Sequence, residues 1–210
     1  MKWDEFLAQF GSAPVILSEH LRSFAHKWKA PEVQISRWVR SGKLIQLKRG
    51  VYLLADLYRK TNHFEPFLAG LLKAPSYVSL EKALEWHGLI PESVPATISV
   101  TPKRPAVYNT PVGRFVYRNI QRDLFWGYEG HTLNGQVGFV ARPEKALLDM
   151  VYLNNIHVTD DYLAELRLQN TGVISRKTLR EFSVRFNKRI VIEAAGKIQK
   201  FLDALPKGGK

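Results

Sequence analysis

The sequence predicts an α+β fold, with a small N-terminal unit of short helices and a hairpin, a mixed α/β region, and a helical C-terminal third. Three observations lead to this fold class. A stretch of helical spacing that begins at Pro31 runs directly into two short apolar segments separated by Lys48-Arg49-Gly50. Alternating apolar segments recur between residues 96 and 140, as is typical of strands. Beyond residue 143 the apolar residues follow a helical period.

The composition is that of a folded globular protein. A chain of 210 residues is long enough for one large domain or two small ones. The sequence has no cysteine, which excludes disulfides, thiolate metal sites and cysteine nucleophiles. No apolar run approaches the ~20 residues that span a bilayer, and the start of the chain, with Asp4 and Glu5, does not resemble a secretory signal. We therefore expect a cytoplasmic protein that does not bind membranes.

The net charge of +12 is concentrated at the two ends of the sequence. Residues 1–60 hold 11 basic and 5 acidic side chains, and residues 173–210 hold 10 and 3, whereas the middle is close to neutral. Clustered positive charge favours contact with polyanions, because phosphate neutralisation releases counterions. The alternative is that these segments are solvated surfaces that keep the protein soluble.

Two short helices are predicted before residue 30. The first covers Trp3 to Phe10 and ends at Gly11, and the second begins at Ser18, a favourable N-cap, and continues through Phe24. Between them, residues 14–17 are expected to be extended. The residues of this second helical segment that we expect to face inward are Leu17, Leu21, Phe24 and Trp28.

A third, amphipathic helix is predicted for Pro31–Ser41. Proline suits the first turn of a helix, and Gly42 suits the left-handed conformation that ends one. The two faces differ in chemistry: Ile35, Trp38 and Val39 gather on one side, and Ser36, Arg37 and Arg40 on the other. We expect the aromatic side to lie in the core.

A hairpin is predicted for Leu44–Leu54, with Lys48 and Arg49 at its tip. Three short helices and a two-stranded wing within about 55 residues match a winged helix-turn-helix in size and order. We place this domain at residues 1–58 and a mixed α/β domain at residues 63–210, because the segment between them is polar and lacks periodicity.

In a winged helix-turn-helix, the exposed face of the third helix enters the major groove and the wing lies along the phosphate backbone. The residues expected at base edges are Gln34, Ser36, Arg37 and Arg40, and those expected at phosphates are Lys43, Lys48 and Arg49. Double-stranded DNA is therefore the expected partner. The alternative is an ordinary surface helix with a solvated cationic face.

Beyond the boundary, helices are predicted for residues 64–73 and 80–87, with residues 74–79 as a turn and cap. Strands are predicted for residues 96–101, 115–117 and 137–140, and a helix opened by Pro143 runs to residue 153. Thr159 and Ser175 are predicted N-caps of two further helices. The apolar face of the last helix is either core or a homo-oligomer interface. Whether the basic run before it, Arg176 to Arg189, contacts nucleic acid is left open.

The motifs of common enzyme sites are absent. The sequence has no HExxH, GxxxxGK[ST], GxGxxG after a strand, or GxSxG, and its histidines are scattered singly. We therefore expect no enzyme activity, no cofactor and no metal. The enzymatic alternatives are an acid–base site formed by Glu81, Glu85 and His87, and a divalent-metal nuclease whose carboxylates and lysine are Asp123, Glu129, Glu144 and Lys145.

An ordered series of motifs resembles the AbiEi-type antitoxin and transcriptional-regulator family. The motifs are Gly42–Leu44, Arg49–Tyr52, Tyr77–Leu84, His87–Glu92, Ser99–Thr101, Gly113–Tyr117, Phe125–Glu129 and Pro143–Asp149. The resemblance covers residues 12–155 and implies a winged helix that binds promoter DNA, often at inverted repeats, with Pro31–Ser41 as the reading helix and Leu44–Leu54 as the wing. It also implies a C-terminal domain with antitoxin activity.

The usual partner locus of this family encodes a nucleotidyltransferase-type toxin, and the pair forms a type IV system without an obligatory stable complex. We therefore expect an autoregulating antitoxin, and the alternative is a stand-alone repressor without a toxin.

Overall fold

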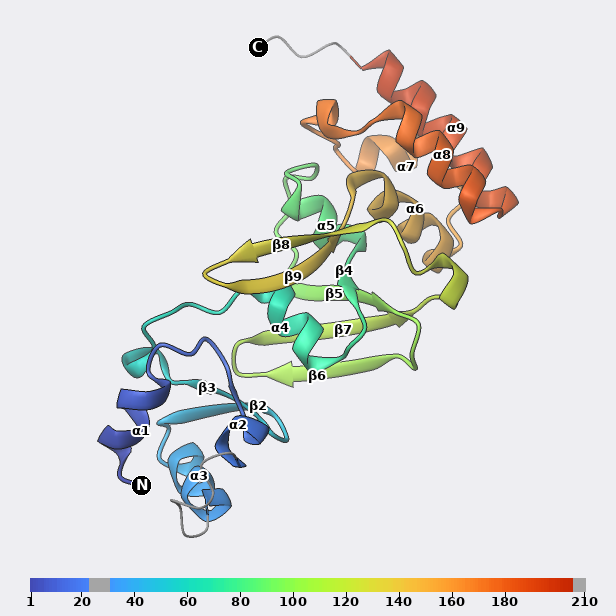
Figure 1. Cartoon of the computed structure of the whole chain (residues 1–210). Coiled ribbons are helices and arrows are strands. Elements are labelled where there is room, and N and C mark those ends of the chain that lie inside the picture. Colours follow the sequence, from blue (N-terminus) through green and yellow to red (C-terminus); the bar gives the residue numbers. More distant parts are fainter. Residues whose placement is uncertain (23–30, 206–210) are drawn as a thin grey trace.

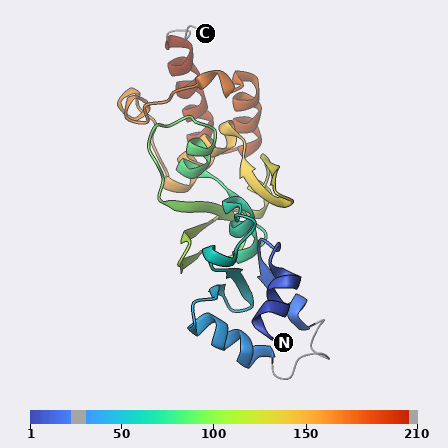
Figure 2. The same ribbon diagram turned by 90° about the vertical axis from the view of Figure 1, so that its left-hand side faces the viewer.

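The computed structural model describes residues 1–22 and 31–205 and has an α+β architecture with two sheets. A three-stranded antiparallel sheet lies in the N-terminal unit, a six-stranded mixed sheet forms the middle, and helices form the C-terminal region (Figure 1). The molecule is elongated: Figures 1 and 2 both place the N-terminal unit at one end and the C-terminal helices at the other.

The N-terminal unit has the predicted order of elements. They are α1 (Trp3–Phe10), β1 (Ile16–Leu17), α2 (Ser18–Arg22), α3 (Pro31–Arg40), β2 (Leu44–Lys48) and β3 (Val51–Leu54). β3 lies between β1 and β2, so the wing gains a third, short strand. The predicted end of the second helix and the inward positions of Phe24 and Trp28 lie outside the described residues.

Aromatic side chains of α1 and α3 form the centre of this unit. Trp38 of α3 lies with its ring centroid 4.6 Å from that of Phe6 and 5.0 Å from that of Trp3. Ile35 and Leu44 are buried in the same cluster. The prediction that the aromatic side of α3 faces the core is therefore confirmed.

The wing sheet has two buried faces. Leu44 and Leu54 belong to the aromatic cluster beneath α1 and α3. Leu47, Val51 and Leu53 instead belong to the large cluster that continues into the rest of the protein. The two predicted domains therefore share a packed surface, and a short 3₁₀ helix, η2 (Asp56–Tyr58), connects them.

The central sheet combines parallel and antiparallel pairs. Its strands are β4 (Tyr77–Val78), β5 (Ala96–Thr101), β6 (Ala106–Thr110), β7 (Gly113–Asn119), β8 (Tyr128–Leu133) and β9 (Gln136–Ala141), in the order β6-β7-β5-β4-β9-β8. The predicted strands at residues 96–101, 115–117 and 137–140 are confirmed. β4 replaces part of the turn predicted for residues 74–79, and β6 and β8 were not predicted.

Helices cover both faces of this sheet. α4 (Glu65–Leu72) lies on one face, where the Tyr117 hydroxyl donates a hydrogen bond of 2.7 Å to the carbonyl oxygen of Ala69. α5 (Leu80–Trp86) and α6 (Pro143–Asn154) lie on the other, where the Tyr77 hydroxyl reaches Asp149. β9 approaches α4 so closely that a Cβ at Gly138 would lie 2.5 Å from the backbone nitrogen of Phe67.

The C-terminal helices are α7 (Asp160–Glu165), α8 (Arg176–Phe186) and α9 (Arg189–Ala204), with the 3₁₀ turn η4 (Thr171–Val173) between α7 and α8. A further 3₁₀ turn, η3 (Arg122–Leu124), lies between β7 and β8. Thr159 accepts a hydrogen bond from the Tyr162 backbone and Ser175 one from Thr178, so both predicted N-caps are confirmed. The apolar face of α9 packs within the chain, because Val191, Ala194, Ala195, Ile198 and Leu202 are all buried in the core. Of the two predicted roles for this face, core and homo-oligomer interface, the structure therefore supports core. None of the helices in the described ranges is long and apolar enough to cross a membrane.

Candidate nucleic-acid interface

The exposed surface of α3 carries the candidate base-reading side chains. Ile35 and Trp38 are buried, and Gly42 adopts a φ of +70°, the left-handed conformation that ends the helix after Arg40. This anchoring turns Ser36, Arg37 and Arg40 to solvent, while Gln34 is half-buried at the side of the helix.

α3 lies at the end of the molecule farthest from the C-terminal helices (Figures 1 and 2). The side chains of Arg37 and Arg40 are exposed and are not packed beneath the second domain. An arginine pair on an open helix surface satisfies the steric requirement for entering a major groove.

A hollow of about 330 Å³ separates α3 from the wing. Ser36 and Arg40 line it from the helix, and Gln46 and Tyr52 line it from β2 and β3. Gln46 and Tyr52 were not predicted as site residues, although Gln46 is a polar side chain within an apolar strand. The sequence prediction also omitted Val33, whose side chain is 51% exposed on the same side of α3 as Arg37.

Two of the predicted phosphate-binding residues, Lys43 and Arg49, reach the surface at the two ends of β2. The Lys43 ammonium sits 5.0 Å from the centre of the Trp3 ring, a cation–π contact that positions it at the turn after α3. Arg49 is exposed at the wing tip. The tip is fastened to the start of α2 by a 2.9 Å hydrogen bond from the Ser18 backbone nitrogen to the Gly50 carbonyl oxygen. Gly50 has a φ of +82°, which explains the glycine at this corner.

Lys48 has a different environment from the one expected of a phosphate ligand. Its ammonium donates two hydrogen bonds of 2.8 Å to the carbonyl oxygens of Leu71 and Leu72, at the C-terminal end of α4. Burial lowers the pKa of Lys48, and the charge of Lys73 lowers it further. The negative end of the α4 dipole therefore holds this lysine, which joins the wing to the second domain.

The structure also corrects the proposed nuclease site. Glu144 and Lys145 are buried in α6, whereas Asp123 and Glu129 are exposed on other elements. One Glu144 oxygen accepts a 2.7 Å hydrogen bond from the Ser175 backbone nitrogen, so this carboxylate holds the start of α8. A buried glutamate and lysine have no access to a phosphodiester. Within residues 1–22 and 31–205, no cluster of three or more histidine, aspartate and glutamate side chains is placed to hold a metal ion.

The alternative acid–base residues do not form a site either. Glu85 lies 3.0 Å from the Lys82 ammonium, and His87 Nε2 is 2.8 Å from the carbonyl oxygen of Ala141, to which it donates. Burial lowers the pKa of His87. These groups are held by separate structural contacts.

Lys145 instead belongs to a buried polar network. Its ammonium pairs with Asp149 one helical turn later and donates a 2.9 Å hydrogen bond to the Tyr77 hydroxyl. The hydroxyls of Tyr77 and Ser79 donate to the second Asp149 oxygen at 2.9 and 2.8 Å. Ser79 therefore binds Asp149 rather than capping α5 with its side chain. The network ties β4 to α6, and the ring of Phe186 lies 4.6 Å from the ammonium.

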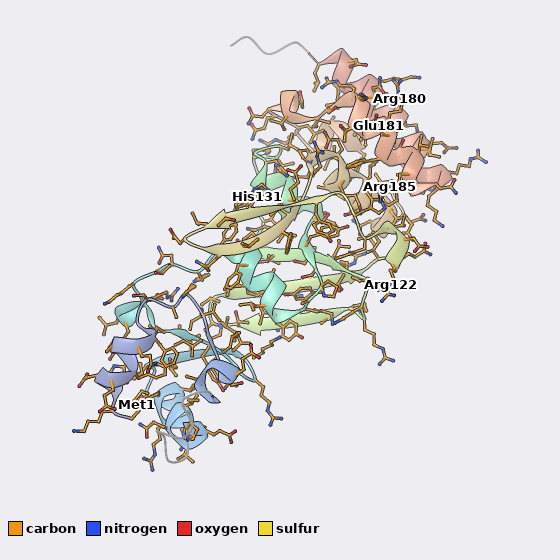
Figure 3. The ribbon with its side chains drawn as sticks, viewed as in Figure 1. Met1, Arg122, His131, Arg180, Glu181 and Arg185 are labelled. Atoms are coloured by element: carbon orange, nitrogen blue, oxygen red, sulfur yellow. The ribbon has the colours of Figure 1, made fainter. Side chains whose placement is uncertain are left out.

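The second basic segment lies at the opposite end of the molecule. Figure 3 shows Arg180 and Arg185 on α8, far from Met1 and the N-terminal unit. Part of this charge is structural: Arg176 contacts Asp203 and donates to the Leu202 carbonyl oxygen, and the Arg185 guanidinium lies 4.2 Å from the Trp126 ring centre. The basic segment from Arg176 to Arg189 therefore contains some side chains that pack against neighbouring elements and others that are exposed to solvent.

Comparison of the sequence with models of known protein families found no match, and comparison with curated proteins found none either.

Proposed function

We propose that this protein is a sequence-specific DNA-binding transcriptional regulator that inserts α3 into the major groove. The observation that carries the proposal is the exposed cationic surface of α3, anchored by buried Trp38 and placed at a free end of the molecule beside a hairpin with Arg49 at its tip. Helix and wing supply the two kinds of contact that such recognition needs, one to base edges and one to phosphates.

The individual roles follow from side-chain chemistry. Arg37 and Arg40 present the planar donor fork that pairs with guanine, and Gln34 and Ser36 are suited to hydrogen bonds with neighbouring base edges. Lys43 and Arg49 contact phosphates. Lys48 is left out of the DNA-contacting set, because its ammonium already has two carbonyl partners.

The test is a binding titration on the DNA upstream of the protein's own gene. Arg37→Ala is expected to weaken binding to the cognate site by about 1–3 kcal/mol and to relax base preference at one position. Arg167→Ala is a matched control, since it removes the same charge from an exposed site after α7, where Arg167 pairs with Glu92. Footprinting is expected to show inverted half-sites. Equal binding by wild type and Arg37→Ala, or equal loss in both variants, would remove α3 from the proposed interface.

We further propose that the regulator is the autoregulating antitoxin of a type IV system with a nucleotidyltransferase toxin. Support comes from the motifs of the AbiEi resemblance, since Tyr77, Ser79, Lys145 and Asp149 belong to two of them and meet in one buried network. Coexpression with the neighbouring gene tests the proposal. Growth rescue is expected from the wild type and from Arg37→Ala alike, because the antitoxin activity is assigned to the second domain. If expression of the neighbouring gene is not toxic, the antitoxin proposal fails and the protein is instead a stand-alone repressor.

A further inference from the structure

An apolar cavity of about 320 Å³ lies between the end of α4, the segment that follows it, and β9. The rings of Phe67, Phe125, Tyr128 and Phe139 form its walls, together with Leu71, and no charged side chain of the described residues lines it. Its volume is within the range of small-ligand sites.

The cavity is held open by its surroundings. Tyr128 stacks on Tyr77 with ring centroids 4.6 Å apart, and the hydroxyl of Tyr77 is fixed by the buried Lys145–Asp149 pair. Gly70 of α4 also lines the cavity, and a Cβ built there would meet no described atom within 4 Å. A rigid aromatic wall opposite an open stretch of backbone favours a flat ligand that stacks on the rings.

The wall at the end of α4 also contacts the wing. Leu71 lines the cavity, and its carbonyl oxygen accepts a hydrogen bond of 2.8 Å from Lys48. Lys48 directly precedes Arg49 at the wing tip. A ligand that shifts the last turn of α4 therefore displaces the carbonyl oxygen that holds Lys48. Lys48 is in turn the chain neighbour of Arg49, which belongs to the proposed DNA surface.

We propose that this cavity binds a small, uncharged, planar aromatic molecule, and that its occupancy is linked through Leu71 and Lys48 to the wing. A charged ligand is disfavoured because the lining offers no counter-charge for a desolvated ion. Phe139 is 42% exposed, so a stacked ligand removes apolar surface from water. The link to the wing rests on the proposed function, whereas the ligand site does not.

The site is tested by titrating the full chain with N-phenyl-1-naphthylamine, an uncharged aromatic probe whose fluorescence rises in apolar surroundings. Gly70→Leu is expected to weaken binding by about tenfold or more, because the leucine side chain occupies the volume of the ligand. Leucine also favours helix more than glycine does, so the melting temperature is not expected to fall. Gly196→Leu is the matched control: Gly196 is an exposed glycine of α9, and a Cβ there also meets no described atom within 4 Å.

Phe139→Lys is a second variant, which places a charge at the mouth of the cavity and is expected to weaken probe binding similarly. No binding by the wild type, or equal binding by wild type and both cavity variants, would overturn the site. Probe binding that declines as protein concentration rises would show that a second copy of the chain covers the cavity, and would also overturn it.

The link is tested by DNA-binding anisotropy with and without saturating probe. The wild-type affinity is expected to change by about fivefold or more, and Lys48→Met is expected to remove that change. If the probe does not change the affinity of the wild type for DNA, the link to the wing is overturned, whereas the ligand site itself is unaffected by that result. A chain that binds no DNA would overturn the proposed function and the link together, while the probe titration would still decide the site.

Discussion

Replacing Lys145 with methionine is the sharpest test of how the second domain is held together. Lys145 and Asp149 are both fully buried, and the network joins α6 to β4 at the middle of the sheet. Methionine keeps most of the lysine stem but removes the ammonium. The Asp149 carboxylate then stays buried with only the hydroxyls of Tyr77 and Ser79 as partners.

The expected loss of stability is large. Removing one partner of a buried ion pair costs about 3–5 kcal/mol, because the remaining charge is desolvated and uncompensated. For a chain of this size each kcal/mol lowers the melting temperature by roughly 2–4 °C, so a fall of about 6–20 °C is expected. The double variant Lys145→Met/Asp149→Asn is expected to recover part of this loss, since asparagine still accepts the two hydroxyl hydrogen bonds without a charge.

The loss should also depend on pH. Burial raises the pKa of Asp149, and the Lys145 ammonium opposes that rise. Without the lysine, only the hydrogen bonds from Tyr77 and Ser79 oppose the effect of burial, so the pKa of Asp149 in the folded variant rises further above its unfolded value. The folded variant then binds a proton that the unfolded chain does not, so its stability falls as pH rises between these two pKa values.

Urea unfolding followed by circular dichroism at ~pH 5 and ~pH 8 measures both effects. The difference between wild type and Lys145→Met is expected to be larger at the higher pH. A variant within about 1 kcal/mol of wild type at both pH values would refute the argument that the pair holds a desolvated charge. So would a double variant no more stable than the single one.

Three other variants test the N-terminal unit. Arg49→Ala is expected to reduce the salt slope of DNA binding by about 0.9 with unchanged stability, as measured by anisotropy across a salt series. Lys48→Met is expected to leave that salt slope unchanged but to lower the free energy of unfolding in urea by ~1–3 kcal/mol, because the carbonyls of Leu71 and Leu72 lose their donor. A lower salt slope with unchanged stability would instead show that Lys48 contacts DNA. Trp38→Ala is expected to cost roughly 3–5 kcal/mol, and a variant that keeps its melting temperature would show that the packing of α3 is misassigned.

Local signals in the sequence predicted the helices and the wing well. Pro31 and Gly42 bracket α3, and the +70° φ of Gly42 matches its predicted left-handed conformation. Thr159 and Ser175 cap helices as predicted, since a cap depends on contacts within a few residues. The polar and apolar faces of α3 also follow from spacing alone.

Strands that depend on their neighbours were harder to predict. β4 has only two residues, and it is a strand because β5 and β9 bind it on either side. β6 was not predicted; it lies between Pro105 and Pro111, where prolines interrupt the local strand pattern. Partners of this kind are distant in sequence, so no short-range pattern identifies them.

The sequence by itself determined which residues form helices, where those helices end, and which side of α3 is apolar, because these properties depend on contacts between near neighbours in the chain. Only the tertiary structure decided what each polar side chain contacts. The identical tetrapeptides that begin at Glu81 and Glu144 show this: Lys82 is partly buried and pairs with Glu85, whereas Lys145 is fully buried against Asp149. Lys48 likewise looks like a wing-tip cation in sequence and binds the end of α4 in the fold. A periodic pattern specifies that a face is buried, but the partner that buries it comes from the packing of distant segments.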